Sequence, residues 1–142
     1  MYPQGNDKST RRLQEKHTLP YKILIVEDND NNGTLLSDLL IYHGYEVAMA
    51  SNGQKGVNLA RELLPDLILM DIQMPGLDGM SACSILKRDP PTSRLKIIAL
   101  TAFAMQGDQE KFLAAGFDGY LSKPISIREL PILVERWLKN ES

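Results

Sequence analysis

The sequence lacks several features that would assign it to a common class of protein. It has a single cysteine, Cys83, so no internal disulfide can form. No apolar run is long enough to span a membrane or to form the core of a signal peptide. Neither sign of charge dominates, because 16 basic residues stand against 18 acidic ones and leave a net charge of −2. These absences predict a cytoplasmic protein with no membrane insertion and no direct contact with nucleic acid.

The chain divides into a short polar segment and one longer patterned segment. Residues 1–20 contain several basic side chains and few apolar ones, which is typical of a flexible N-terminal tail. Apolar runs and amphipathic stretches then alternate almost without interruption. We therefore expect one compact domain over residues 21–142, long enough to bury its own hydrophobic core.

Five short apolar runs, several of them rich in β-branched residues, predict strands at 22–26, 45–50, 67–71, 95–100 and 117–121. Five stretches with helical periodicity follow them, at about 29–43, 53–64, 78–88, 106–115 and 126–138. The last helix contains Pro131, so it either begins there or is kinked. The alternation predicts an α/β fold in which a doubly wound parallel sheet has helices on both faces.

Apolar positions in these helical stretches predict which side chains face the sheet. The expected inward residues of the first three helices are Leu35, Leu36, Leu39 and Leu40; Val57, Ala60, Leu63 and Leu64; and Met80, Cys83 and Leu86.

Acidic residues end two of the predicted strands. The run at 67–70 leads into Asp71, and the first strand leads into Glu27 and Asp28. An ionised carboxylate at the end of a buried strand is costly to desolvate unless something stabilises it. Neighbouring parallel strands would bring the three carboxylates together, and such clusters occur mostly where a proton is shared or a divalent cation binds. An all-oxygen set with room for water suits Mg²⁺ better than zinc.

Two more polar residues follow strands and are expected at the same edge. Thr101 follows the fourth strand and Lys123 follows the fifth. In doubly wound sheets the functional crevice lies beyond the carboxyl ends of the strands. A hydroxyl and a cation are therefore expected beside the three acids.

At these positions the sequence resembles the receiver domain of two-component response regulators, over about residues 21–139. The resemblance rests on five features in the family's order: Glu27-Asp28, the segment MDIQMPGLDG at 70–79, Thr101-Ala102, Tyr120, and Lys123-Pro124. It implies a flavodoxin-like (CheY-like) three-layer sandwich with strand order 2-1-3-4-5 and a cis Lys123-Pro124 bond. It also implies phosphorylation of Asp71 by a histidine kinase or a histidine phosphotransfer protein, with Mg²⁺ as cofactor and an unknown downstream protein partner.

A phosphoryl transfer of this kind needs positioning and charge neutralisation more than a reactive side chain. Asp71 is expected to accept the phosphoryl group and, with Asp28 and the backbone carbonyl of Gln73, to hold Mg²⁺. Glu27 is expected to act through a metal-bound water. The phosphoryl oxygens are expected to meet the hydroxyl of Thr101, the N–H of Ala102 and the ammonium of Lys123.

The resemblance also suggests how phosphorylation alters the protein. Thr101 and Lys123 are expected to be drawn in together, with Tyr120 turning inward to fill the space behind Thr101. This movement is expected to change the partner affinity of the α4-β5-α5 face, formed by the fourth helix, fifth strand and fifth helix. Phe103, two residues past Thr101, is expected to slow dephosphorylation by limiting the access of water.

Other classes of protein fit less well. A phosphatase of the haloacid dehalogenase type needs a second aspartate two residues past its nucleophile, and here that position is Gln73. A flavin or nucleotide binder needs a phosphate-binding loop after the first strand, where Glu27 and Asp28 would repel the ligand. We therefore expect a regulator that catalyses only its own phosphorylation and dephosphorylation. It is expected to be a single-domain protein, the alternative being a receiver fragment of a hybrid histidine kinase or of a longer response regulator.

Overall fold

The computed structural model describes residues 20–102 and 108–139, and the other residues lie outside the described part of the chain. One parallel sheet has the strand order β2-β1-β3-β4-β5, which confirms the predicted topology. Its strands are β1 (Lys22–Val26), β2 (Glu46–Ala50), β3 (Leu67–Asp71), β4 (Ile97–Thr101) and β5 (Gly119–Ser122). The helices are α2 (Asp30–Tyr42), α3 (Gly53–Leu63), α4 (Gly79–Arg88), α5 (Asp108–Ala114) and α6 (Leu130–Lys139).

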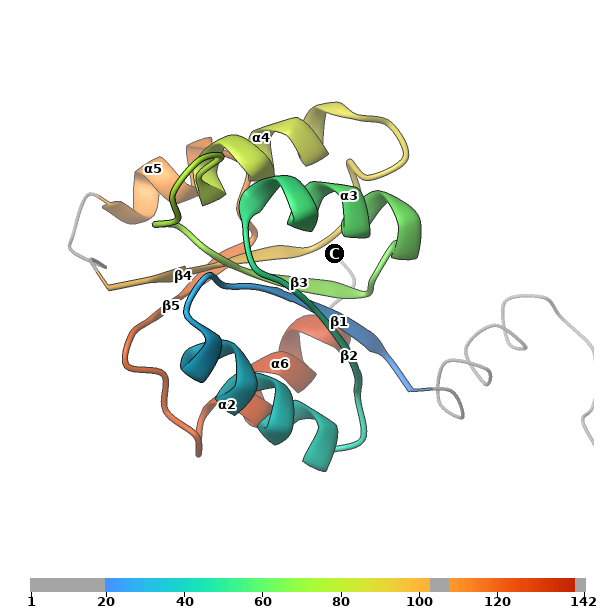
Figure 1. The fold of residues 1–142 in the computed structure, drawn as a ribbon, viewed down its shortest axis with the longest axis vertical. Helices are drawn as coiled ribbons and strands as arrows, with labels where there is room; N and C mark the ends of the chain where they lie inside the picture. Colours follow the sequence, from blue (N-terminus) through green and yellow to red (C-terminus); the bar gives the residue numbers. More distant parts are fainter. Residues whose placement is uncertain (1–19, 103–107, 140–142) are drawn as a thin grey trace, which may run out of the picture.

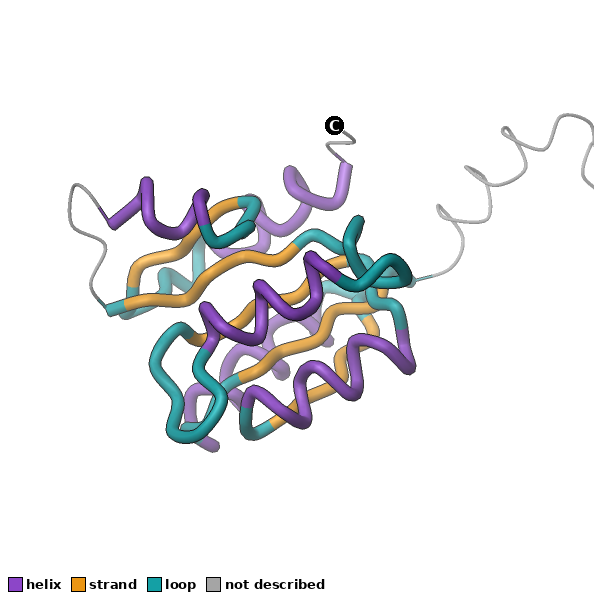
Figure 2. Tube along the Cα trace, turned by 90° about the horizontal axis from the view of Figure 1, so that it is seen from above, coloured by secondary structure: helices purple, strands orange, loops and turns teal. Residues whose placement is uncertain are grey.

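The molecule has three layers. Helices α3, α4 and α5 cover one face of the sheet, and α2 and α6 cover the other (Figure 1). Seen from above, the strands lie side by side with helices running along them (Figure 2). Each helix returns the chain to the starting edge of the sheet, so every strand ends at the same edge.

Alternate side chains of each central strand point to opposite faces of the sheet and belong to two separate hydrophobic cores. In β3, Ile68 and Met70 point into the core beneath α3, α4 and α5, whereas Leu67 and Leu69 point into the core beneath α2 and α6. All five residues of β3 are buried. A strand that is buried on both faces reads as a continuous apolar run, as the segment 67–70 does.

Three helices begin at the carboxyl edge of the sheet with the same kind of cap. The side chains of Asn29, Asn52 and Asp78 each accept a hydrogen bond from the backbone N–H three residues later. A short polar side chain at this position satisfies one of the donors that the first helical turn leaves unpaired. These caps are local in sequence, so they determine where each helix begins next to the functional edge.

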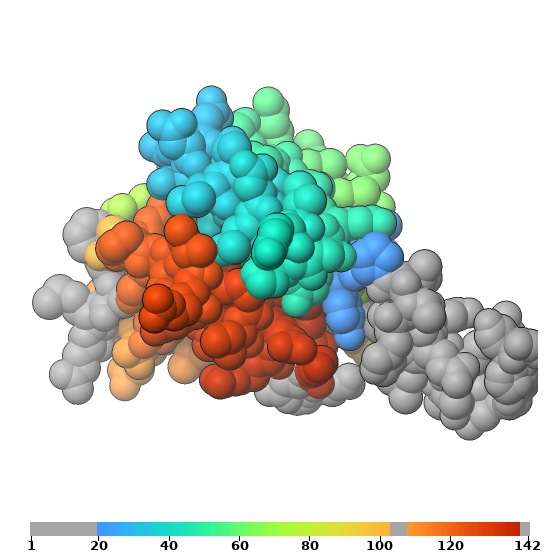
Figure 3. All heavy atoms as spheres, turned by 90° about the horizontal axis from the view of Figure 1, so that it is seen from below, coloured from blue at the N-terminus to red at the C-terminus, as the bar shows by residue number. Residues whose placement is uncertain are grey.

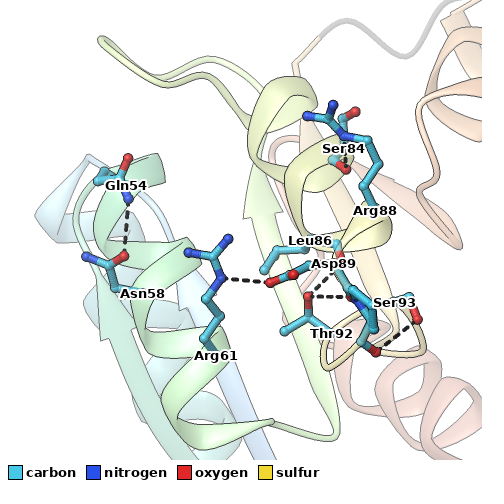
Figure 4. A network of polar contacts seen from close by, with 10 residues as sticks. Gln54, Asn58, Arg61, Ser84, Leu86, Arg88, Asp89, Thr92 and Ser93 are labelled. Atoms are coloured by element: carbon cyan, nitrogen blue, oxygen red, sulfur yellow. Dashed lines mark hydrogen bonds and ion pairs between the residues drawn. The ribbon is translucent and has the colours of Figure 1, made fainter.

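The end of α4 is held by polar contacts, several of which are drawn in Figure 4. The hydroxyl of Thr92 donates to the carbonyl of Leu86 at 2.6 Å, which gives a partner to a carbonyl in the last helical turn. Arg61 of α3 forms an ion pair with Asp89 at 3.0 Å, so the two helices are also joined across their surface. The predicted end of this helix near Asp89 is correct, because Asp89 is its C-terminal cap.

Two leucines expected to face the core are exposed instead. Leu35 is 52% exposed and Leu64 is 51% exposed. Leu35 and Leu36 are consecutive in a helix, where adjacent side chains point about 100° apart, and the sheet covers only Leu36. Leu64 lies just past the end of α3 in a left-handed conformation with φ = +46°, so its side chain leaves the buried face.

The remaining differences from the prediction concern boundaries. Helix α6 begins at Leu130, so Pro131 lies in its first turn, where no backbone N–H is needed. Phe103 and Gln106, on which two predictions rested, lie outside the described residues, as do residues 1–19 of the predicted tail. Within the described ranges, none of the helices combines the length and the apolar character that crossing a membrane requires.

Candidate functional site

Three carboxylates meet at the carboxyl edge of the sheet. Strand β1 leads into Glu27 and Asp28, and its neighbour β3 ends in Asp71. One ligand oxygen from each of the three residues lies within 4.8 Å of the others. Glu27 and Asp71 are each only 3% exposed, whereas Asp28 is exposed to solvent. The sheet therefore gathers the predicted acids into one partly buried cluster.

Lys123 lies directly against this cluster. Its ammonium donates a hydrogen bond to Asp71 Oδ2 at 2.9 Å and lies 3.1 Å from Glu27 Oε1. The backbone supports this placement, because the N–H of Lys123 donates to the carbonyl of Thr101 at the end of β4. The Lys123-Pro124 peptide bond is cis, as the resemblance implied. One cation thus contacts two of the three acids.

The electrostatics of the cluster depend on burial and proximity. Burial, and next the contact with Asp71, raise the pKa of Glu27 to about 7, although the N–H of Asn29 and the ammonium of Lys123 act in the opposite direction. Burial lowers the pKa of Lys123, but the contacts with Asp71 and Glu27 outweigh it and leave the pKa raised. Lys123 therefore stays charged, while Glu27 can take up a proton near neutral pH.

The loop after β3 orients the Asp71 carboxylate. Its Oδ1 accepts a hydrogen bond from the backbone N–H of Gln73 at 3.0 Å. Since Oδ2 accepts from Lys123, both oxygens of the carboxylate are held in place by donors. On the first strand, Glu27 Oε2 accepts from the N–H of Asn29 at 3.2 Å.

Two glycines allow this loop to pack closely. A Cβ added at Gly79 would lie 2.2 Å from the carbonyl oxygen of Asp71. A Cβ added at Gly53, the first residue of α3, would lie 2.1 Å from the carbonyl oxygen of Leu77. No real Cβ lies so close to a backbone oxygen, so only glycine fits at these positions without a shift of the backbone. The loop is therefore packed against both its own strand and helix α3.

Thr101, Ala102 and Tyr120 lie on the adjoining strands. Thr101 ends β4 and is 2% exposed, and Ala102 follows it on the surface. Strand β4 pairs with β3 so that Leu100 faces Asp71, which places Thr101 one residue beyond that pair. Tyr120 lies on β5 opposite Ala99, and its side chain packs against the core beneath α3, α4 and α5.

The residues at this edge have the donor set that Mg²⁺ prefers. Three carboxylates can supply oxygen ligands, and exposed Asp28 leaves access for water. Among the described residues, Glu27 Oε1 accepts no hydrogen bond, because Lys123 lies at ion-pair distance without hydrogen-bond geometry. Lys123 therefore compensates part of the charge on this buried oxygen, and a metal ion or a water bound to it could supply the additional contact. The cluster therefore fits a magnesium ion.

An apolar groove of about 430 Å³ borders the same edge and was missed by the sequence analysis. Its charged lining residues are Glu27 and Lys123, and most of the rest of the lining comes from α2 and from the segment after β5. Leu35 and Ile127 lie in this lining and are 52% and 55% exposed. The signal in the sequence was the Leu35-Leu36 doublet, because one sheet face cannot bury both residues.

Comparisons with known proteins agree with this geometry. Residues 23–135 match the family described as the response regulator receiver domain. The chain is 46% identical over 109 residues to the polar-differentiation response regulator DivK of Brucella anthropi, and the match covers 77% of this chain and 89% of that protein.

Solved structures give the same result. The receiver domain of a sensor histidine kinase from Pseudomonas aeruginosa, with a magnesium ion coordinated in its active site cleft, is 40% identical with a TM-score of 0.79, covering 85% of this chain and 99% of that one. The chemotaxis protein CheY4 of Vibrio cholerae is 26% identical with a TM-score of 0.78, covering 82% and 98%. The family match, these relatives and the acidic edge of a 2-1-3-4-5 sheet lead to one conclusion: the chain belongs to the receiver domain family of response regulators.

Proposed function

We propose that Asp71 accepts a phosphoryl group from a phosphohistidine on a histidine kinase or histidine phosphotransfer protein, and that this step switches the surface the chain offers to a downstream partner. The observation that carries the proposal is the position of Asp71. Its carboxylate lies in a cluster of three acids and is held by the ammonium of Lys123 and the N–H of Gln73. A structural aspartate at a strand end has no need of such surroundings.

The transfer forms one bond and breaks one. A carboxylate oxygen of Asp71 forms a P–O bond as the P–N bond to the donor histidine breaks, and the imidazole nitrogen keeps the electron pair. The product is an acyl phosphate. Lys123 compensates negative charge on the phosphoryl oxygens, while the Thr101 hydroxyl and the Ala102 N–H bind others.

Glu27, Asp28, Asp71 and the carbonyl of Gln73 would hold Mg²⁺, Glu27 through a water molecule. When bound, the ion supplies positive charge that lets the carboxylate and the phosphoryl group approach each other. Asp28 is the exposed member of the cluster, so it provides the route by which the ion enters. The chain would act on its own phosphoryl group only and would turn over no free substrate.

The groove beside Lys123 is the proposed docking site of the histidine-bearing helix of the donor. A donor has to bring its phosphoryl group to Asp71 across the edge where this groove ends. Figure 3 shows the face on which α2 lies beside the segment leading into α6. Leu35 and Ile127 expose apolar surface there, and burying such surface favours binding.

The proposed switch connects Asp71 with the α4-β5-α5 face of the prediction, which is the face of α5, β5 and α6 in this structure. Thr101 would be drawn to the phosphoryl group, and Tyr120 would turn into the space behind it. Replacing Tyr120 with alanine should leave phosphorylation intact and weaken partner binding. We further propose that the chain works as a single-domain regulator, the form that its similarity to DivK favours.

The first test is the intact mass of the protein after incubation with acetyl phosphate, with and without Mg²⁺. We expect a single phosphoryl adduct that requires Mg²⁺ and is absent from Asp71→Asn. Asp89→Asn, which changes an acid far from this edge, is the control and should form the adduct normally. No adduct in the native protein under either condition would overturn the proposal and leave a binding module that works without phosphorylation.

A second test separates donor docking from chemistry. With a phosphorylated histidine phosphotransfer protein as donor, Leu35→Asp should slow transfer by about 10-fold, because it places a charge in the apolar contact. Transfer from acetyl phosphate, which needs no docking surface, should be unchanged. The matched control is Ile41→Asp on the same helix, since Ile41 is 54% exposed but does not line the groove. Equal slowing by both variants would refute the docking site.

A further inference from the structure

Helix α5 buries one side chain against the rest of the molecule. Of its seven residues, all of which the structure describes, Phe112 alone is buried, at 6% exposure. Its neighbour Leu113 is 62% exposed. The position of this short helix on the sheet therefore depends on what Phe112 contacts.

Phe112 contacts two aromatic rings, one just before β5 and one within it. Its ring centroid is 6.3 Å from that of Phe117 with the planes at 81°, an edge-to-face arrangement. It is 6.1 Å from the ring centroid of Tyr120 with the planes at 47°. Aromatic pairs at such separations attract each other beyond the effect of burial. Phe117 precedes β5 and is 2% exposed, so it provides a fixed wall, whereas Tyr120 is only half-buried.

We infer that Phe112 is the positioning residue through which Tyr120 controls the placement of helix α5. The inference rests on the proposed function, in which Tyr120 moves when Asp71 is phosphorylated. If Tyr120 turns toward Thr101, it withdraws its ring from Phe112 and removes one of the two aromatic contacts that Phe112 makes. The helix then shifts or loosens, and the position of exposed Leu113 on the α5–β5–α6 face changes with it.

The physical reason is that α5 has no second buried side chain to take over. A helix with several buried residues would keep its place when one contact changed, because the others would hold it. In α5 a movement of Tyr120 acts on a single buried ring, Phe112, whose contacts link the helix directly to β5. Phe112 carries no group that could accept a phosphoryl group or bind the ion, and it is not among the residues proposed for the chemistry.

Hydrogen exchange of the α5 amides, read by mass spectrometry before and after phosphorylation with acetyl phosphate and Mg²⁺, tests the inference. In the native chain we expect the exchange rate of α5 to change by about 2- to 10-fold on phosphorylation, the effect of losing one aromatic contact. In Phe112→Leu this change should disappear while the intact mass still shows the adduct. Phe112→Tyr, which keeps the ring, should restore it, and Leu113→Ala, which alters an exposed neighbour, should retain it.

Three outcomes are decisive. A phosphorylation response in α5 that survives in Phe112→Leu would overturn the inference, and so would a native chain that forms the adduct without any change in α5. An absent adduct in the native chain would instead refute the proposed function, which the mass measurement shows separately. If Phe112→Leu loses protection throughout the sheet, Phe112→Met, which keeps an apolar chain of similar length, replaces it with the same criteria.

Discussion

Glu27 is a buried carboxyl group whose protonation depends on the acid and the cation beside it. Its carboxyl group is nearly inaccessible, contacts Asp71 and Lys123, and has a pKa raised to about 7. In the absence of metal, the folded state therefore binds a proton more tightly than the unfolded chain does. Stability due to this proton is complete below the unfolded pKa of about 4.5 and is lost as the pH rises through 7.

Unfolding by urea in the presence of a chelator measures this effect. Between pH 5 and pH 8, the native protein should lose about 1–3 kcal/mol of unfolding free energy that Glu27→Gln does not lose, because glutamine stays neutral. Asp38→Asn, at an exposed acid of α2 that does not belong to the cluster, is the control and should follow the native profile. Parallel pH profiles for the native protein and Glu27→Gln would contradict the assignment.

Cys83 is a buried thiol with no role in the proposed chemistry. It has no exposed surface, and burial raises its pKa to about 12. The thiolate is the reactive form, so at pH 8 its fraction is about 10³-fold lower than for a thiol with the ordinary pKa near 9.

A disulfide reagent should therefore react with Cys83 at least about 100-fold more slowly in the native protein than in urea. The control combines Cys83→Ala with Ser81→Cys, which moves the thiol to an exposed position of the same helix and should react rapidly in both conditions. Fast labelling of Cys83 in the native protein would show that α4 opens readily.

At the scale of elements, the loop between β3 and α4 is placed by its contact with α3. Gly53 allows the first turn of α3 to lie against the carbonyl of Leu77. Substituting alanine forces the backbone of the loop or of the helix to move. The same loop supplies the N–H of Gln73 that orients Asp71, so a change in how the loop packs would also alter the position of this carboxylate.

Gly53→Ala should lower the unfolding free energy by about 1–3 kcal/mol, the usual cost of forcing an extra methyl group into a packed site. Urea unfolding measures it. Gln54→Ala, one residue further along α3 and exposed, should change stability by no more than about 0.5 kcal/mol. Equal effects of the two substitutions would mean that the contact with Leu77 relaxes without cost.

For the whole molecule, the acidic cluster forms only when the chain folds, so the proposed binding of Mg²⁺ would be coupled to folding. The three carboxylates come together only when β1 and β3 lie side by side, so the unfolded chain has no comparable site. An ion that binds the folded state alone stabilises it in proportion to the logarithm of its concentration.

Thermal unfolding should therefore shift upward with Mg²⁺, by the equivalent of about 2.7 kcal/mol at 100 times the dissociation constant. Asp28→Asn should abolish most of this shift. Asp30→Asn, an exposed acid two residues away that does not belong to the cluster, should retain it. A shift that both variants share would indicate a nonspecific salt effect.

Much of this fold could be predicted from local patterns. The run at 67–70 and the acid after it specify a buried strand that ends at a functional edge, and β3 is Leu67–Asp71 as predicted. Asn29, Asn52 and Asp78 cap helices because their side chains bond to a backbone N–H only three residues away. Strand order needed more than local information, and it followed from the resemblance to the receiver family.

Other features depended on which elements pack together. The sequence contains two leucines at 35 and 36, but only the position of the sheet leaves Leu35 to line a groove. Likewise, Lys123 and Glu27 are separated by almost the whole domain in sequence and become an ion pair only at the common strand edge.

The sequence by itself therefore determined the alternation of strands and helices, the capped helix starts and the identity of the charged residues at the strand ends. These depend on interactions within a few residues of each other. The sequence placed Lys123 beside the three acids, but only the tertiary structure decided that its ammonium contacts both Glu27 and Asp71, and that Phe112 contacts Tyr120. Such contacts join segments whose separation is set by helix packing and strand order, which no local pattern contains.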